Sequence, residues 1–191
     1  ALNCVANGKI LREKYFEDIW IQPAAGDAGG SLGAALAYWH RELDKPRGDL
    51  KDKMKGAYLG PRLEVSSVQR NLKSLKAVYK EKTSSEISSL VAKELANSKT
   101  VGWFQGRMEF GPRALGARSI LADPRSEKMQ KELNWKIQLR ASFRPFAPSV
   151  LREDVKEWFE IDYDSPYMLL VSDVKKEKQI TMSEKDNKLF G

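Results

Sequence analysis

The sequence predicts an α/β protein, in which short strands and amphipathic helices alternate along the chain. Residues 16–22 (FEDIWIQ) and Val101–Phe104 (VGWF) are short aromatic and β-branched runs, which favour strands. Segments with apolar residues at helical spacing lie next to both runs. Hydrophobic residues make up 41% of the 191 residues, enough for a folded core.

The first unit has the pattern of a strand, a small-residue turn and a helix. Pro23 ends the predicted strand, and the turn AAGDAGGS at residues 24–31 contains Asp27. A turn of small residues lets a ligand approach the backbone and leaves helix N–H groups pointing outward. The predicted helix that follows has an apolar face made of Leu32, Leu36, Trp39 and Leu43.

A polar segment broken by Pro46 and Gly48 follows this unit. Breaks of this kind favour loops. We therefore predict a first domain at residues 1–44, a linker at 45–56 and a second domain at 57–191. Within the second domain, residues 64–82 predict a helix whose buried stripe contains Val68, Leu72, Leu75 and Val78.

The clearest helix signal begins at Thr83. Thr83 and Glu86 fit a capping box, in which each side chain binds a backbone N–H at the helix start. The strand Val101–Phe104, a long loop at 106–122 and a helix from Asp123 are expected next. Further predictions are an extended segment at 143–151 ending in a short strand, a strand at 167–171, and loop over the last twenty residues.

Composition narrows the function classes. The single cysteine, Cys4, excludes an internal disulfide framework and fits a reducing cytosol, so we expect a cytoplasmic protein. The single histidine, His40, excludes a His/Cys metal cluster within the chain. No run approaches the ~20 apolar residues that a membrane span needs. The chain begins without Met and in mid-pattern, so we expect a fragment of a longer protein.

The stretch at residues 106–119 (GRMEFGPRALGARS) contains the densest set of chemically active side chains. Three arginines and Glu109 lie among glycines and a proline. Guanidinium groups bind oxyanions through two nitrogens, and glycines let the backbone approach a ligand. A second cluster, Arg140 and Arg144, follows in the same region. These features favour a phosphate site, and the alternative is an ordinary surface loop with solvated arginines.

Three regions resemble, in order, the signatures of the O-carbamoyltransferase family. They are ALNCVANGKI with IQPAAGDAGGSLGAAL at residues 1–10 and 21–36, GRMEFGPRALGARSILADPR at 106–125 and LNWKIQLRASFRPFAPSVL at 133–151. The family includes nodulation-factor, cephamycin-type and tobramycin-type carbamoyltransferases. The signatures are distributed between residues 1 and 151, so together they span most of the chain.

This resemblance implies a two-domain enzyme. Residues 1–44 would be a strand-turn-helix remnant of an actin-like ATPase-fold domain, and residues 57–191 would begin a YrdC-like domain with a twisted mixed sheet. The YrdC-like domain would convert ATP and carbamoyl phosphate into carbamoyl adenylate. A divalent metal, Fe or Mg, would then assist transfer to a hydroxyl of a small-molecule acceptor, such as a sugar or secondary metabolite. A homo-oligomer is compatible with this resemblance, whereas a membrane or a specific nucleic acid is not an expected partner.

The resemblance also implies residue roles. Asp27 matches a metal-ligand aspartate whose partner histidines are absent from this chain, and a helix N-cap is the alternative role for this residue. Asn3 matches a polar contact to the nucleotide. The remaining expected ligands of carbamoyl phosphate or the adenylate are Arg107, Arg113, Arg118, Ser119, Asn134, Arg140 and Arg144. Of these, Arg113 and Arg118 would act in catalysis by stabilising charge on phosphoryl oxygens. Glu109 would pair with one arginine and orient it.

Two departures and two alternatives accompany this interpretation. Gln138 and Ala141 stand where the family pattern has Lys and Glu. A basic nucleic-acid-binding module is an alternative, since the sequence pI is about 9.4. A structural or degenerate domain, which binds these substrates without catalysis, is the other.

Overall fold

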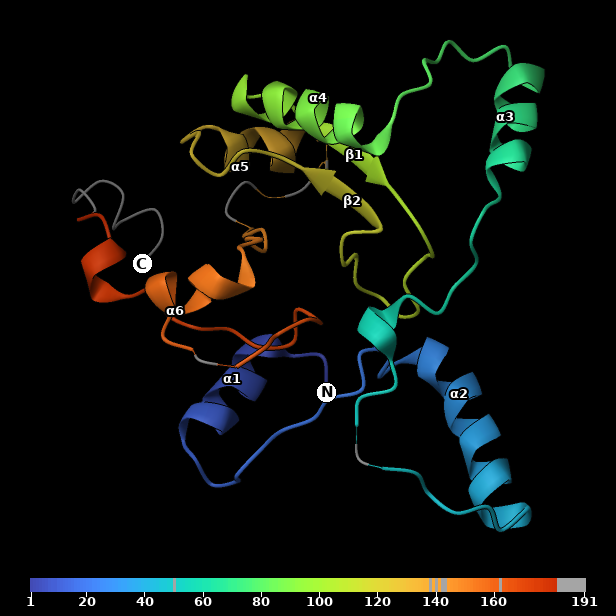
Figure 1. The fold of residues 1–191 in the computed structure, drawn as a ribbon. Coiled ribbons are helices and arrows are strands. Elements are labelled where there is room, and N and C mark those ends of the chain that lie inside the picture. Colours follow the sequence, from blue (N-terminus) through green and yellow to red (C-terminus); the bar gives the residue numbers. More distant parts are fainter. Residues whose placement is uncertain (50, 138, 140, 142–143, 162, 182–191) are drawn as a thin grey trace.

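The computed structural model describes residues 1–49, 51–137, 139, 141, 144–161 and 163–181 (Figure 1). The α-helices are α1 (Cys4–Arg12), α2 (Asp27–Ala37), α3 (Val65–Ser74), α4 (Ser84–Ala96), α5 (Met129–Glu132) and α6 (Val155–Trp158). The strands are β1 (Val101–Phe104) and β2 (Arg118–Leu121), and short 3-10 or π-helical turns lie at Tyr38–Glu42, Lys55–Ala57, Leu133–Ile137, Arg152–Asp154 and Lys176–Lys178. None of the helices in this part of the chain has both the length and the apolarity needed to cross a bilayer.

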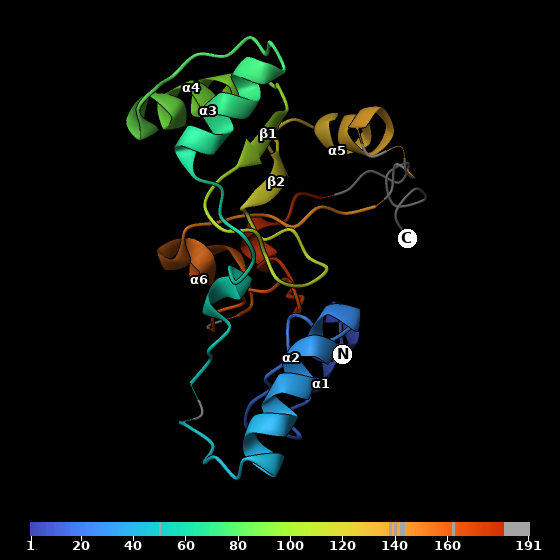
Figure 2. The ribbon, with the colours of Figure 1, turned by 90° about the vertical axis from the view of Figure 1, so that its right-hand side faces the viewer.

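The elements form two groups joined by a loop-rich middle. Helices α3, α4 and α5 lie with the two strands at one end, and α1 and α2 lie at the other (Figures 1 and 2). Strands β1 and β2 pair antiparallel, with Val101 opposite Leu121 and Phe104 opposite Arg118. Helices combined with a small antiparallel sheet are compatible with the predicted α/β class. The twisted mixed sheet expected from the resemblance is not seen, because the described strands form only this two-stranded antiparallel pair.

A small core in the middle joins segments that are distant in sequence. Its buried side chains are Met54, Ala57, Tyr167 and Leu169, and half-buried apolar side chains that include Leu2 pack against them. The Tyr167 hydroxyl donates a hydrogen bond to the Asp52 carboxylate. Burial, together with this bond, raises the pKa of Tyr167 to about 12. The end of the predicted linker at 45–56 is therefore anchored in the core.

Helix α1 approaches the C-terminal segment closely at Gly8. The side-chain amide of Asn7 donates to the Leu169 carbonyl at 3.1 Å. A Cβ atom added at Gly8 would lie 2.8 Å from the carbonyl oxygen of Val171. Glycine at this position thus permits a backbone contact that a side chain would block.

A Gly8→Ala substitution should lower the free energy of unfolding by about 1–2 kcal/mol, because overpacking against a backbone atom outweighs the helix propensity that alanine gains. Gly33→Ala is the matched control, since a Cβ atom at Gly33 in α2 meets nothing within 4 Å. That control should stabilise the protein by roughly 0.5–1 kcal/mol. Urea unfolding of both variants measures the difference, and equal effects would contradict the close contact.

The predicted strand at residues 16–22 is not formed. These residues pair with no strand in the described part of the chain, and Phe16 and Trp20 are largely exposed. A strand needs a neighbour to bind its N–H and C=O groups, which the local pattern does not provide. The helix that follows was correctly predicted, although Asp27 is its first residue and Gly26 is its N-cap.

The predicted helix at 64–82 is shorter than expected. Helix α3 ends at Ser74, and Lys76 adopts a left-handed backbone conformation with a φ of 51°. Leu75 and Val78, assigned to a buried stripe, are exposed. The next helix confirms its prediction, because the Thr83 hydroxyl accepts from the Glu86 N–H and Glu86 accepts from the Thr83 N–H. Strand β1 is also confirmed.

The region after β1 differs from the prediction in three ways. The predicted loop at 106–122 ends at Ala117, because Arg118–Leu121 forms β2. The helix expected from Asp123 begins at Met129, since the Asp123 carboxylate instead accepts the Arg125 N–H in a turn. No strand lies at 167–171 or among the described residues of 143–151.

Candidate functional site in the arginine loop

The loop between β1 and β2 contains the predicted site, and its path depends on glycine. Gly106, Gly111 and Gly116 all have positive φ angles, of 57°, 132° and 104°. A Cβ atom at Gly111 would lie 3.0 Å from the Pro23 carbonyl oxygen. The loop therefore turns sharply and packs against the N-terminal part of the chain.

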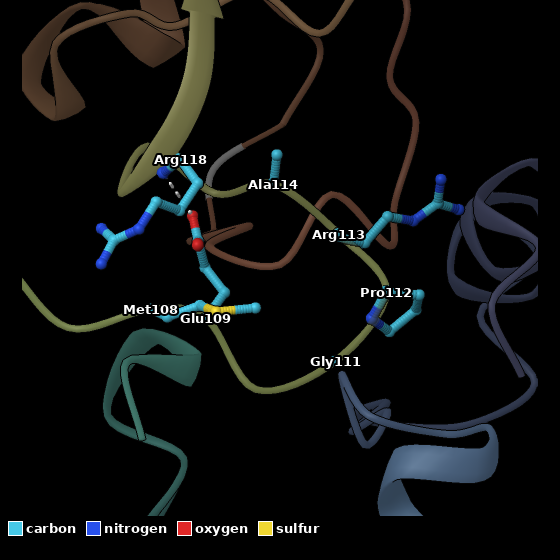
Figure 3. Close-up of a pocket in the computed structure, with 7 residues that line it drawn as sticks. All are labelled: Met108, Glu109, Gly111, Pro112, Arg113, Ala114 and Arg118. Atoms are coloured by element: carbon cyan, nitrogen blue, oxygen red, sulfur yellow. Dashed lines mark hydrogen bonds between the residues drawn. The ribbon is translucent and has the colours of Figure 1, made fainter. Parts of the chain in front are cut away.

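A buried carboxylate lies under this loop. Glu109 is 6% exposed, and its Oε1 atom accepts the N–H groups of Leu115 and Ala117 at 2.8 Å each. The same atom accepts the N–H of Arg118 at 3.4 Å (Figure 3). Burial raises the pKa of Glu109, but backbone N–H groups of Leu115, Glu109 itself, Ala117 and Arg118 lower it, with a net decrease. The carboxylate therefore stays ionised and fixes the backbone of the loop.

Arg118 is held by three backbone carbonyls. One terminal nitrogen donates to the carbonyls of Gln105 and Ala117 at 2.8 Å, and the other donates to Gly106 at 3.2 Å. The guanidinium carbon lies 3.3 Å from the centre of the Phe104 ring, a cation–π stack. These contacts fix the guanidinium plane beside the loop without neutralising its charge.

Arg113 and Arg107 extend in other directions. A terminal nitrogen of Arg113 donates to the Leu2 carbonyl at 3.1 Å, and its Nε atom is buried without a hydrogen-bond partner in the described part of the chain. Arg107 donates to the Gly60 carbonyl at 3.0 Å. Among the described residues, no ion pair involves Arg107, Arg113 or Arg118. Within the described ranges, all three positive charges therefore lack a carboxylate partner.

A small open cavity of about 190 Å³ lies in the loop. It is lined by Met108, Glu109, Gly111, Pro112, Arg113, Ala114 and Arg118. The guanidinium groups of Arg113 and Arg118 point in opposite directions (Figure 3), so they do not converge on one point. Arg107 is not part of the lining. The structure thus brings together two of the three arginines around one cavity, at its sides.

Comparison with known proteins identifies the family. The family description "Carbamoyltransferase C-terminus" matches residues 92–185, which include the whole arginine loop. The description "Carbamoyltransferase N-terminus" matches residues 1–36. The chain belongs to the carbamoyltransferase family.

Relatives of this carbamoyltransferase-family chain are longer proteins. The uncharacterized protein sll1178 of Synechocystis is 54% identical over 100% of this chain and 32% of its own length. Nodulation protein NolO of Bradyrhizobium diazoefficiens is 42% identical over 93% of this chain and 33% of its own length. The 3'-hydroxymethylcephem-O-carbamoyltransferase of Streptomyces clavuligerus is 29% identical over 94% and 32%. The chain spans about a third of the length of these relatives.

Three other predicted ligands of the carbamoyltransferase-family site have structural partners. The Ser119 hydroxyl accepts the Gly116 N–H at 3.0 Å and holds the turn of the loop. The Asn3 side chain accepts the Ala6 N–H at 3.0 Å and caps α1. Asn134 is completely buried and donates to the Arg144 carbonyl at 2.8 Å. Their roles as ligands stay predictions.

The remaining predicted residues lie apart from the loop or outside the described residues. Arg144 is exposed, and Arg140 lies outside the described residues. Asp27 is exposed at the start of α2. In the described part of the carbamoyltransferase-family chain, no group of three or more His, Cys, Asp or Glu side chains is placed to hold a metal ion. These residues alone do not fit a divalent metal centre, and Asp27 as a ligand stays a prediction.

Sequence reasoning missed the parts of the site that depend on backbone contacts. Glu109 was expected to pair with an arginine, but it binds backbone amides. Its position between Met108 and Phe110 was a signal for burial, because a carboxylate between apolar side chains needs partners inside the protein. Phe104, which stacks on Arg118, was assigned only to a strand.

Proposed function

We propose that the protein containing this chain is an O-carbamoyltransferase, which transfers a carbamoyl group to a hydroxyl of a small-molecule acceptor. Family membership supports the carbamoyl chemistry. The name of the Streptomyces relative specifies a hydroxymethyl group as its acceptor, which supports a hydroxyl acceptor here. A sugar or another secondary metabolite would meet this requirement.

The observation that carries the proposal is the uncompensated charge around the loop cavity. Arg113 and Arg118 line it, and neither has a carboxylate partner among the described residues. The buried Nε atom of Arg113 has no acceptor in the part of the chain that the structure describes. A buried donor without a partner is costly, so an anionic ligand that accepts its hydrogen bond would be favoured. A phosphate group has the charge and the acceptor oxygens for this place.

We assign carbamoyl phosphate and ATP as the substrates of the first step. Water would release phosphate from carbamoyl phosphate and leave carbamate. The carbamate oxygen would attack the α-phosphorus of ATP, giving carbamoyl adenylate and pyrophosphate. An acceptor hydroxyl would then take the carbamoyl group and release AMP. The two arginines would stabilise negative charge on phosphoryl oxygens, since positioning and electrostatics dominate such transfers.

The test is exchange of labelled pyrophosphate into ATP by the full-length protein. Exchange should require carbamoyl phosphate and should be absent when acetyl phosphate replaces it, because only the carbamoyl donor forms the adenylate. Labelled ATP formed equally without carbamoyl phosphate, or not formed at all, would reject the adenylate route. Binding to duplex DNA that weakens steeply with salt would instead favour the nucleic-acid alternative.

A further inference from the structure

Glu109 interacts with the loop through backbone amides and not through the arginine side chains. One of its oxygens accepts the N–H groups of Leu115, Ala117 and Arg118. No ion pair among the described residues includes this carboxylate. The negative charge is therefore balanced by convergent amide dipoles.

These three amides belong to the segment that sets the direction of both cavity arginines. Leu115 comes two residues after Arg113, and the amide at position 118 belongs to Arg118 itself. The turn between them contains Gly116 at a φ of 104°, and glycine restrains its own backbone little because it has no Cβ atom. One buried oxygen thus ties together the piece of chain that separates the two guanidinium groups.

The same amides are unavailable to a bound ligand. Convergent N–H groups in a glycine-rich loop commonly bind phosphate oxygens, but here Glu109 occupies the amides of Leu115 and Ala117 at 2.8 Å. A ligand in the cavity would then contact the arginine side chains, while the amides of the loop backbone would stay bound to Glu109.

We propose that Glu109 is the positioning residue of the anion site: its carboxylate oxygen anchors the backbone at 115–118 so that Arg113 and Arg118 flank the cavity. This inference rests on the proposed carbamoyltransferase function for its activity readout. In a positioning role, activity depends mainly on where the Glu109 oxygen lies and only secondarily on its negative charge. If Glu109 instead neutralised the arginines, activity would depend mainly on its negative charge.

The two roles predict opposite orders for two substitutions. Glu109→Gln keeps an acceptor oxygen at the same distance from the backbone and removes the charge. Glu109→Asp keeps the charge and withdraws the oxygen by about 1.5 Å, the length of one carbon–carbon bond. In the full-length protein, Glu109→Gln should keep carbamoyl-phosphate-dependent exchange within about tenfold of the wild type. Glu109→Asp and Glu109→Ala should lose about 100-fold, as expected for misplacement by an ångström or more.

Hydrogen exchange of the loop amides provides a readout that does not depend on activity. The amides of Leu115 and Ala117 should be protected in the wild type and in Glu109→Gln, and should exchange rapidly in Glu109→Asp and Glu109→Ala. Glu17→Ala, at an exposed glutamate, is the matched control and should change neither activity nor protection.

The outcomes separate the two proposals. If the amides respond to the substitutions as expected but the protein has no pyrophosphate-exchange activity, the proposed function is rejected. The anchoring role of Glu109 is then retained. Higher activity in Glu109→Asp than in Glu109→Gln would overturn the positioning role in favour of charge pairing. Unchanged amide protection in Glu109→Asp would also overturn it, and this comparison remains available if Glu109→Ala does not fold.

Discussion

Arg113→Ala should reduce carbamoyl-phosphate-dependent pyrophosphate exchange by about 100- to 1,000-fold, the usual effect of removing one donor that stabilises charge in a transition state. Arg113 combines a cavity position with a buried Nε atom that has no hydrogen-bond partner among the residues with a described structure. Its loss removes both a positive charge and a directed hydrogen bond. Steady-state exchange rates of the purified full-length variant measure the effect.

Two control variants separate this role from a structural one. Arg113→Lys keeps the charge without the planar fork, and it should recover only part of the activity because an ammonium group binds two oxygens less well. Arg70→Ala removes an exposed arginine from α3 and should leave exchange unchanged. Thermal unfolding monitors the fold, because Arg113 also donates to the Leu2 carbonyl. Exchange near the wild-type rate in folded Arg113→Ala would remove Arg113 from the site.

The sequence predicted best those elements that depend on neighbouring residues. The capping box needs only Thr83 and Glu86, three positions apart, and the structure contains both of its hydrogen bonds. The strand at Val101–Phe104 also formed, with Arg118–Leu121 as its partner. The strand expected at 16–22 has no such partner among the described strands. Strand formation depends on distant pairing, which one segment's composition does not reveal.

Apolar spacing identified a helix in residues 64–82 but not its end or its burial. Periodicity tells which side chains share a face, whereas burial requires another element opposite that face. Leu75 and Val78 lie beyond the helix end and are exposed. Lys76 follows the helix end in a left-handed conformation, and the sequence gives no signal for it because the residue is neither glycine nor asparagine.

The chemical content of the arginine loop was predictable, but the directions of its side chains were not. Glycine and arginine spacing pointed to residues 106–119, and two of the arginines do line one cavity. Their directions depend on backbone carbonyls, such as that of Leu2, more than a hundred positions from Arg113. The three arginines therefore do not converge on one point in the structure. A pattern of residue types contains no information about such distant acceptors.

The largest expected loss of stability follows Asn134→Asp. Asn134 has an exposed fraction of 0%, and its side-chain nitrogen donates to the Arg144 carbonyl at 2.8 Å. Aspartate would place a carboxylate oxygen against that carbonyl oxygen. Burying a carboxylate against a carbonyl oxygen should lower the free energy of unfolding by about 3–5 kcal/mol at neutral pH. Urea unfolding of the full-length protein, followed by circular dichroism, measures this loss.

The pH dependence of that loss distinguishes buried charge from simple loss of packing. Burial favours the protonated carboxyl, so the pKa of the introduced aspartate should be higher in the folded than in the unfolded protein. The penalty should then shrink as the pH falls towards about 4, where the unfolded chain also binds the proton. Gln130→Ala removes the second donor to the same carbonyl, at 3.2 Å, and should cost only about 1 kcal/mol with no such pH dependence. A pH-independent loss in Asn134→Asp would mean that the side chain at position 134 reaches water, and Asn134 would then be accessible to a ligand as the family resemblance implied.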